Sequence, residues 1–259
     1  MSKKFSVLIK KKIKKFNQAI IVESDKSISH RALLISSQCI GKSVLNGVLE
    51  SSDVENTITC LKDLGVKIIK KNKKYMVYGN GFSSFKNINN KKLYAGNSGT
   101  LARMLIALIS TQPNLKINIS GDSSLNKRDM SRIINPLSKI GCNFYPKGKA
   151  TLPLTVEGTS MPLAQHHVET IGSAQVKSAI LLASLNTPGI TTIEGKKISR
   201  NHTENLLTSL KSVPVRNAVR KNVKSAHDTE MICNKVLESR RIVFRIYART
   251  VSPNIPPRP

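Results

Sequence analysis

The feature that most constrains the fold is a pattern of helix, strand, helix and strand that recurs about three times along the chain. The first helices of the three units are KSISHRALLISSQ (26–38), NSGTLARMLIALIS (97–110) and SAQVKSAILLASL (173–185). Each is followed by a short β-like stretch, SVLNGV, KINISG or ITTIEG. Repeated alternation of this kind predicts an α/β fold in which helix faces cover sheets.

Each unit continues with a second helix that has a cap, an apolar face at helical spacing and, in the first two units, a glycine stop. After these stops, Val66 to Ile69 and Cys142 to Tyr145 are expected to be extended. The expected caps are Ser52 or Asp53, then Asp129, then Asn201, and the stops are Gly65 and Gly141. The apolar faces consist of Val54, Ile58, Leu61 and Leu64, then Ile133, Leu137 and Ile140, then Leu206, Leu207 and Leu210.

The third unit breaks the pattern after its second helix. Where a glycine and a strand should follow, the chain has Val213, Pro214, Val215 and Arg216. Up to residue 211 there are 27 Lys and 5 Arg, but from 212 onward there are 3 Lys and 7 Arg, and five of the 11 Pro lie there. We therefore expect a non-matching tail at 212–259, either frameshifted or disordered, and an incomplete third unit.

The formal net charge of +27 permits several kinds of anionic partner. Residues 1–15 contribute seven Lys, but the surplus is spread over the whole chain. Aromatic residues make up only 4% and Trp is absent, which argues against a base-stacking surface. The absence of any run of about 18 apolar residues argues against a membrane span. The four isolated Cys and the adjacent His166 and His167 do not have metal-ligand spacing, so no metal site is expected.

The start of the first helix, DKSISHR, is the sharpest candidate site. Ser24 or Asp25 can cap it, which places Lys26 and Ser27 in the first turn and Arg31 on the same face as Ser27. Unpaired backbone N–H groups and the helix dipole favour an anion there. Together these side chains can hold a phosphate or carboxylate, although a solvated helix start explains them equally simply.

Similar residues recur at other helix starts. AGNSGT offers glycines that let the backbone approach a ligand, but it lacks the Gly-Lys-Ser/Thr of a phosphate-binding P-loop. Each position alone is weak evidence, and together they converge on anionic ligands. The candidates are Asn97, Gly99, Thr100, Arg128, Ser173, Gln175 and Arg200.

DKSISHRALL, GNSGTLARML, SLNKRDMSRIINPL and GSAQVKSAILLA with NTPGITTIEG resemble the 5-enolpyruvylshikimate-3-phosphate (EPSP) synthase family over residues 5–211. The resemblance implies the enolpyruvyl transferase fold of repeated βαβαββ units, with 24–211 as one of the family's two domains. It implies that 1–23 forms strands of the other domain. It further implies enolpyruvyl transfer from phosphoenolpyruvate to the 5-hydroxyl of shikimate 3-phosphate, with no cofactor or metal, in a cytoplasmic monomer that binds neither nucleic acid nor membrane.

The same resemblance implies roles for the candidate residues. Lys26, Ser27 and Arg31 would contact shikimate 3-phosphate, with Lys26 also near phosphoenolpyruvate. Gly99 and Arg128 would serve phosphoenolpyruvate, and Gly99 would leave room for glyphosate. Ser173, Ala174, Gln175 and Arg200 would line the phosphate pocket of shikimate 3-phosphate.

Family members are much longer, and their catalytic base and several phosphoenolpyruvate ligands belong to the half that has no counterpart here. We therefore leave the catalytic residue unassigned and expect impaired turnover. Two alternatives stay open: a basic protein that binds nucleic acid or another polyanion, and a non-functional gene fragment.

Overall fold

A computed structural model describes Leu8 and residues 24–86, 92–195, 199–210, 228–238 and 241–251. The expected N-terminal strands within 1–23 lie outside these residues. The helices are α1 (Lys26–Gln38), α2 (Ser52–Asp63), α3 (Gly99–Ser110), α4 (Ser131–Ile140), α5 (Ala174–Ser184), α6 (His202–Leu210) and the short 3₁₀ helix η1 (Leu125–Lys127). The strands are β1 (Ile40–Asn46), β2 (Lys67–Lys71), β3 (Lys74–Asn80), β4 (Lys92–Tyr94), β5 (Lys116–Ser120), β6 (Asn143–Tyr145), β7 (Leu154–Glu157), β8 (His166–Glu169), β9 (Gly189–Gly195), β10 (Asp228–Glu238) and β11 (Arg241–Val251).

The strands form three sheets with one shared topology. The second sheet has the order β4-β5-β7-β6, in which β4 and β5 are parallel and the other pairs are antiparallel. The third sheet repeats this arrangement as β8-β9-β11-β10. The first sheet, β1-β3-β2, repeats its last three positions. This confirms the expected α/β class with repeated βαβαββ units.

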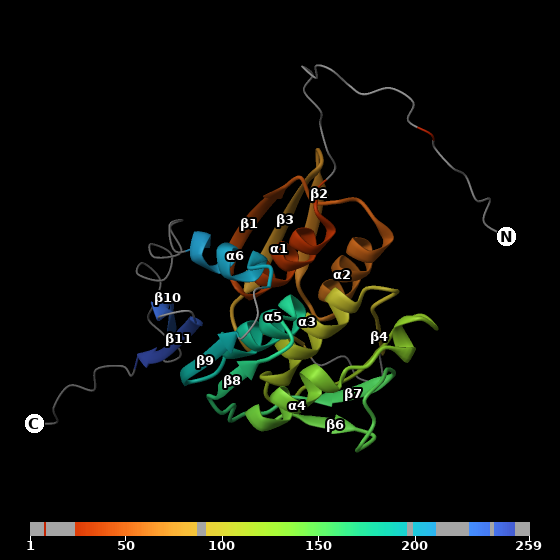
Figure 1. The fold of residues 1–259 in the computed structure, drawn as a ribbon. Helices are drawn as coiled ribbons and strands as arrows, with labels where there is room; N and C mark the ends of the chain where they lie inside the picture. The colour runs from red at the N-terminus through yellow and green to blue at the C-terminus, as the bar shows by residue number, and fades with distance from the viewer. Residues whose placement is uncertain are drawn as a thin grey trace, which may run out of the picture.

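The first helices of the three units, α1, α3 and α5, form the centre of the molecule, and the sheets lie around them (Figure 1). Nearly every side chain of α3 and α5 is buried, including Leu105, Ile106 and Leu181 at 0% exposure. Because α3 and α5 are apolar on all sides, they are buried in the interior instead of covering one face of a sheet with a single apolar stripe. The helix α4, which is the second helix of its unit, has a single buried stripe that contains Ile133, Leu137 and Ile140.

The local signals at helix ends are mostly confirmed. The Asp25 carboxylate caps α1 by accepting from the backbone N–H of Ile28 at 2.7 Å. Gly141 ends α4 in the left-handed region, with φ +111. The expected cap of α2 is wrong, because α2 begins at Ser52 and its cap position is Ser51.

The expected cap of α4 is also displaced. Met130 occupies the cap position, but the Asp129 carboxylate still accepts from the backbone N–H of Ser131 at 2.8 Å. Asn201 directly precedes α6, and its carbonyl accepts from the N–H of Asn205 at 3.0 Å, as expected for a helix start.

The third sheet contains two strands, β10 and β11, that lie within the tail expected at 212–259. The strands β10 and β11 take the positions that β6 and β7 take in the second sheet, and β11 pairs with β9 from Ile242 opposite Gly195 to Ala248 opposite Gly189. The β-branched and aromatic residue types in RIVFRIYARTV favour a strand there. The proposed origin of the tail in a frameshift stays a prediction.

Candidate functional site at the helix starts

Side-chain contacts link the starts of the six described α-helices to one another. Lys26 of α1 pairs with Asp53 of α2 at 2.9 Å. Gln175 of α5 donates to the hydroxyl of Thr100 on α3 at 3.0 Å. Helix starts carry unpaired N–H groups and partial positive charge, so their common position creates one anion-attracting surface.

Arg31 lies at the junction of α1, α5 and α6. Its Nε donates to Thr203 Oγ1 at 2.8 Å, and one terminal nitrogen donates to Ser178 Oγ at 3.1 Å. A third bond, at 2.9 Å, goes to the backbone carbonyl of Ser27. These bonds use three of the five guanidinium N–H groups. Burial lowers the pKa of Arg31, and the nearby Glu204 carboxylate opposes that shift.

Lys26 and Ser27 occupy the first turn of α1 as predicted. The Lys26 side chain is 53% exposed although its ammonium group pairs with Asp53, so the lysine is accessible to a ligand. Arg200, just before α6, is exposed and close enough to Arg31 to lower its pKa further. The basic residues of α1 and of the segment before α6 therefore share one region.

A second cationic group surrounds the start of α3. A Cβ placed on Gly99 would lie 2.7 Å from Nη1 of Arg103 and 3.2 Å from Nη1 of Arg128. Arg103 also donates to the Gln175 side-chain oxygen at 2.6 Å, and Arg128 donates to Asn97 at 2.6 Å. Burial lowers the pKa of Arg103 and the positive charge of Arg128 lowers it further, so an anion between the two guanidinium groups would be favoured.

The start of α5 adjoins this second group. The Ser173 hydroxyl caps α5 by accepting from the N–H of Val176 at 3.4 Å, and Ala174 is the first helical residue. Because Gln175 bonds both Thr100 and Arg103, it joins the starts of α3 and α5. The predicted residues thus lie together at one end of the molecule, on α1, α3, α5 and the segments before α4 and α6.

His30 is a structural residue of this end. It is 0% exposed, with Nδ1 at 2.6 Å from Thr57 Oγ1 and Nε2 at 3.0 Å from Ser98 Oγ. Burial lowers its pKa to about 4, with Asp53 opposing the shift. The neutral imidazole therefore ties α1 to α2 and to the cap of α3.

The carboxylates near the site are engaged in local interactions. Asp25 caps α1, and Asp129 bonds the first turn of α4. Asp53 pairs with Lys26, and Glu204 pairs with Lys177. Asp122 accepts from Leu125 N and Asn97 Nδ2, which lowers its pKa.

Sequence reasoning missed three residues of the site. Arg103 follows Gly99 by four positions and so shares its helix face, a signal that was present in GTLARML. Ser178 and Thr203, by contrast, bond Arg31 across 147 and 172 residues of sequence, and no local pattern marks them.

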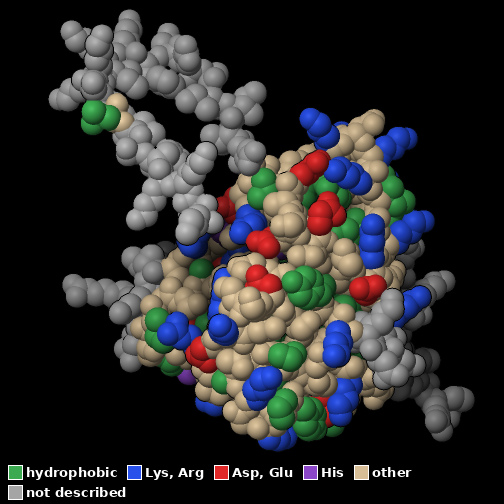
Figure 2. All heavy atoms as spheres, turned by 90° about the vertical axis from the view of Figure 1, so that its right-hand side faces the viewer, with side chains coloured by type: hydrophobic (Ala, Val, Ile, Leu, Met, Phe, Trp, Pro, Cys, Tyr) green, Lys and Arg blue, Asp and Glu red, His purple; other side chains and the backbone are tan. Residues whose placement is uncertain are grey.

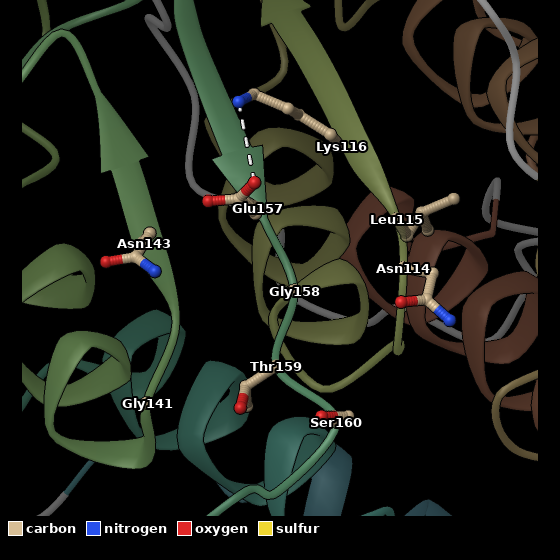
Figure 3. Close-up of a pocket in the computed structure, with 9 residues that line it drawn as sticks. All are labelled: Asn114, Leu115, Lys116, Gly141, Asn143, Glu157, Gly158, Thr159 and Ser160. Carbon is tan, nitrogen blue, oxygen red and sulfur yellow. Dashed lines mark ion pairs between the residues drawn. The ribbon is translucent and has the colours of Figure 1, made fainter.

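The molecule also has a depression away from the helix starts, at the C-terminal ends of α3 and α4 (Figure 3). It has a volume of about 460 Å³, and its lining includes Asn114, Gly141 and Thr159. At its rim, Lys116 pairs with Glu157 at 3.4 Å. Because helix C-termini carry partial negative charge, this depression is a poor anion site.

Within the described residues, no cluster of three His, Cys, Asp or Glu side chains could hold a metal ion. Nor is any helix among them long and apolar enough to span a membrane.

The family model described as EPSP synthase (3-phosphoshikimate 1-carboxyvinyltransferase) matches residues 10–231, past the boundary that we expected at 212. The chain is 41% identical over 187 residues to the 3-phosphoshikimate 1-carboxyvinyltransferase of Paramagnetospirillum magneticum, covering 72% of this chain and 42% of the relative. It is 43% identical over 186 residues to that of Streptococcus uberis, covering 71% and 43%.

Among solved structures, EPSP synthase from Acinetobacter baumannii matches with a TM-score of 0.71 and 31% identity, over 86% of this chain and 46% of that one. The chain thus spans less than half the length of these relatives. The family match over most of the sequence and the likeness in fold agree, and the chain belongs to the EPSP synthase family.

Proposed function

We propose that the chain binds shikimate 3-phosphate and phosphoenolpyruvate and supplies the anion-holding side of enolpyruvyl transfer between them. The observation that carries this proposal is the convergence of helix starts with two separate cationic groups, one around Arg31 and one around Gly99. Two anionic substrates need two such groups. The names of the relatives and the family membership support the same reaction.

The shikimate 3-phosphate site is assigned to the first group. Lys26, Ser27 and Arg31 would bind the substrate from α1, while Arg200 would approach from the segment before α6. Ser173, Ala174 and Gln175 would complete its phosphate pocket at the start of α5. The planar guanidinium of Arg31 suits a carboxylate or phosphate, since it offers paired donors.

The phosphoenolpyruvate site is assigned to the second group. Arg128 and Arg103, of which the second was not predicted from the sequence, would flank the anion, and Gly99 would leave the space between them. Asn97 and Thr100 would hold their present partners, Arg128 and Gln175, in position. The same space would admit glyphosate, which accounts for the inhibition that the family resemblance implies.

The chemistry assigned to these residues is electrostatic. The reaction adds a proton to the methylene carbon of phosphoenolpyruvate while the 5-hydroxyl loses its proton and bonds to the neighbouring carbon. The tetrahedral intermediate then loses phosphate together with one proton of the new methyl group, which restores the carbon–carbon double bond. Fixed positive groups stabilise the charge on that intermediate without reorganising. No base is assigned, because the described carboxylates near the site are engaged elsewhere. Cytoplasmic localisation and a monomeric state belong to the same proposal.

Isothermal titration of the full chain with each substrate tests this proposal. We expect shikimate 3-phosphate to bind, to raise Tm by mass action, and to lose at least tenfold in affinity in the Arg31→Gln variant. The matched control is Lys70→Gln, which removes an exposed lysine of β2 that pairs with Glu50. Absence of binding by the unaltered chain would refute the proposal.

A second candidate, polyanion binding, is favoured by one observation. Exposed lysines lie close together on β2, β3 and the turn between them; they are Lys67, Lys70, Lys71, Lys73 and Lys74. On the face shown in Figure 2, however, Lys and Arg are scattered among acidic side chains rather than gathered in one groove. A steep fall of DNA affinity with salt, together with no response to shikimate 3-phosphate, would favour this candidate.

A further inference from the structure

A buried ion pair lies directly behind the first cationic group. Lys177 of α5 and Glu204 of α6 approach to 2.5 Å, and their side chains are only 9% and 4% exposed. Among the described residues, the Glu204 oxygens find no hydrogen-bond donor besides this ammonium group. A carboxylate this buried depends on its partner, so the pair fixes the contact between α5 and α6.

The residues next in sequence form a second link between the same helices. Thr203 Oγ1 donates to Ser178 Oγ at 2.7 Å, and Ser178 Oγ donates to the Ala174 carbonyl at 2.7 Å. Arg31 donates to both hydroxyls, so the four residues form a hydrogen-bonded chain with a single direction. The orientation of Arg31 therefore depends on how α5 and α6 meet.

We propose that the Lys177–Glu204 ion pair is a positioning device for the anion site: it holds the Arg31 guanidinium in place and aligns the start of α5 with Arg200 ahead of α6. The identity of the ligand, shikimate 3-phosphate, rests on the proposed function. The positioning of Arg31 by the ion pair does not. Glu204 has a second effect, since its negative charge favours the charged form of buried Arg31.

The variant that separates positioning from stability is Lys177→Met/Glu204→Leu. Apolar side chains of similar volume often replace a buried ion pair without loss of stability. We expect Tm to stay within a few degrees, while affinity for shikimate 3-phosphate, measured by titration calorimetry, falls at least tenfold. The matched control is Lys70→Gln/Glu50→Gln, which removes an exposed ion pair and should leave the affinity unchanged.

A second readout follows Arg31 without any ligand. In ¹H–¹⁵N spectra, its Nε–H signal, assigned by its loss in Arg31→Lys, should exchange slowly with water because it is buried against Thr203. In the double variant, exchange should become at least tenfold faster. If the unaltered chain binds no shikimate 3-phosphate, the proposed function fails, and this exchange rate still decides the positioning inference.

Unchanged Arg31 exchange together with unchanged affinity in the double variant would overturn the inference. If that variant does not fold, Glu204→Asp provides the test, because it keeps the charge and shortens the side chain by one methylene group. Its Arg31 Nε–H should exchange at least threefold faster, and a rate equal to that of the unaltered chain would equally count against a positioning role.

Discussion

Gly99→Ala should separate ligand binding from stability. The added methyl group would lie 2.7 Å from Nη1 of Arg103, whereas ordinary contact begins at 3.4 Å, so the guanidinium must retreat. A shift of this size strains its 2.6 Å bond to Gln175 and displaces the guanidinium from the position in which it would meet an anion. The methyl group would also occupy the space toward Arg128, 3.2 Å away, where an anion would sit.

The magnitude follows from the interactions lost. A hydrogen bond to a charged group contributes about 1.5–3 kcal/mol, which corresponds to roughly 10- to 100-fold in affinity. Stability should not fall in parallel, because Gly99 has an ordinary helical φ and Ala is preferred over Gly in helices by up to about 1 kcal/mol. We therefore expect Gly99→Ala to weaken phosphoenolpyruvate and glyphosate by at least about tenfold, with Tm unchanged or higher.

The assay is calorimetric titration of phosphoenolpyruvate, in the presence of shikimate 3-phosphate, beside a thermal melt. Gly41→Ala is the control with the opposite signature. Its φ of +92 strains any side chain, while no atom lies within 4 Å of the new Cβ, so Tm should fall and affinity should hold. Unaltered phosphoenolpyruvate affinity in Gly99→Ala would refute the placement of the anion between Arg103 and Arg128.

Three further variants test the site from other directions. Arg31→Lys keeps the charge but cannot donate to both hydroxyl partners, including Thr203, so calorimetry should show shikimate 3-phosphate affinity lowered by at least about tenfold. The pKa of His30 is about 4 in the folded chain and 6.5 in the unfolded chain, so protonation between these pH values favours unfolding. Urea titrations should therefore show the free energy of unfolding falling by on the order of 3 kcal/mol from pH 6.5 to pH 4. In His30→Gln this fall with pH should be smaller by the same amount. Lys177→Met alone leaves Glu204 buried and unpaired, and should cost about 3–5 kcal/mol in the same urea assay, far more than the double apolar variant.

Local sequence signals were enough for the repeated units and for most of the site. Asp25 before an apolar run predicted the start of α1, and Gly141 predicted the end of α4, because caps and stops act within one helical turn. Lys26 and Arg31 were found for the same reason. The glycine at 99 was predicted as a place of close approach, and the structure adds what it approaches, namely Arg103 and Arg128.

What could not be predicted depends on contacts between distant parts of the chain. Arg31 meets Thr203 across 172 residues, and the Lys177–Glu204 pair joins two helices whose sequences separately show only a lysine and a glutamate. Some short strands could not be predicted for another reason. The strand β4 has three residues and β8 has four, too few for a period of two to be recognised.

The contacts among the starts of the six described α-helices have a consequence for how the protein distributes its own negative charge. Four helix starts carry acidic side chains that act as internal counterions: Asp25 at α1, Asp53 and Glu55 at α2, Asp129 at α4 and Glu204 at α6. The two central helices differ, since α3 and α5 are capped by serines and have no acidic residue in the first turn. The chain thus neutralises the outer helix ends itself and leaves the two inner ones, beside Gly99 and Gln175, to be balanced by whatever anion arrives.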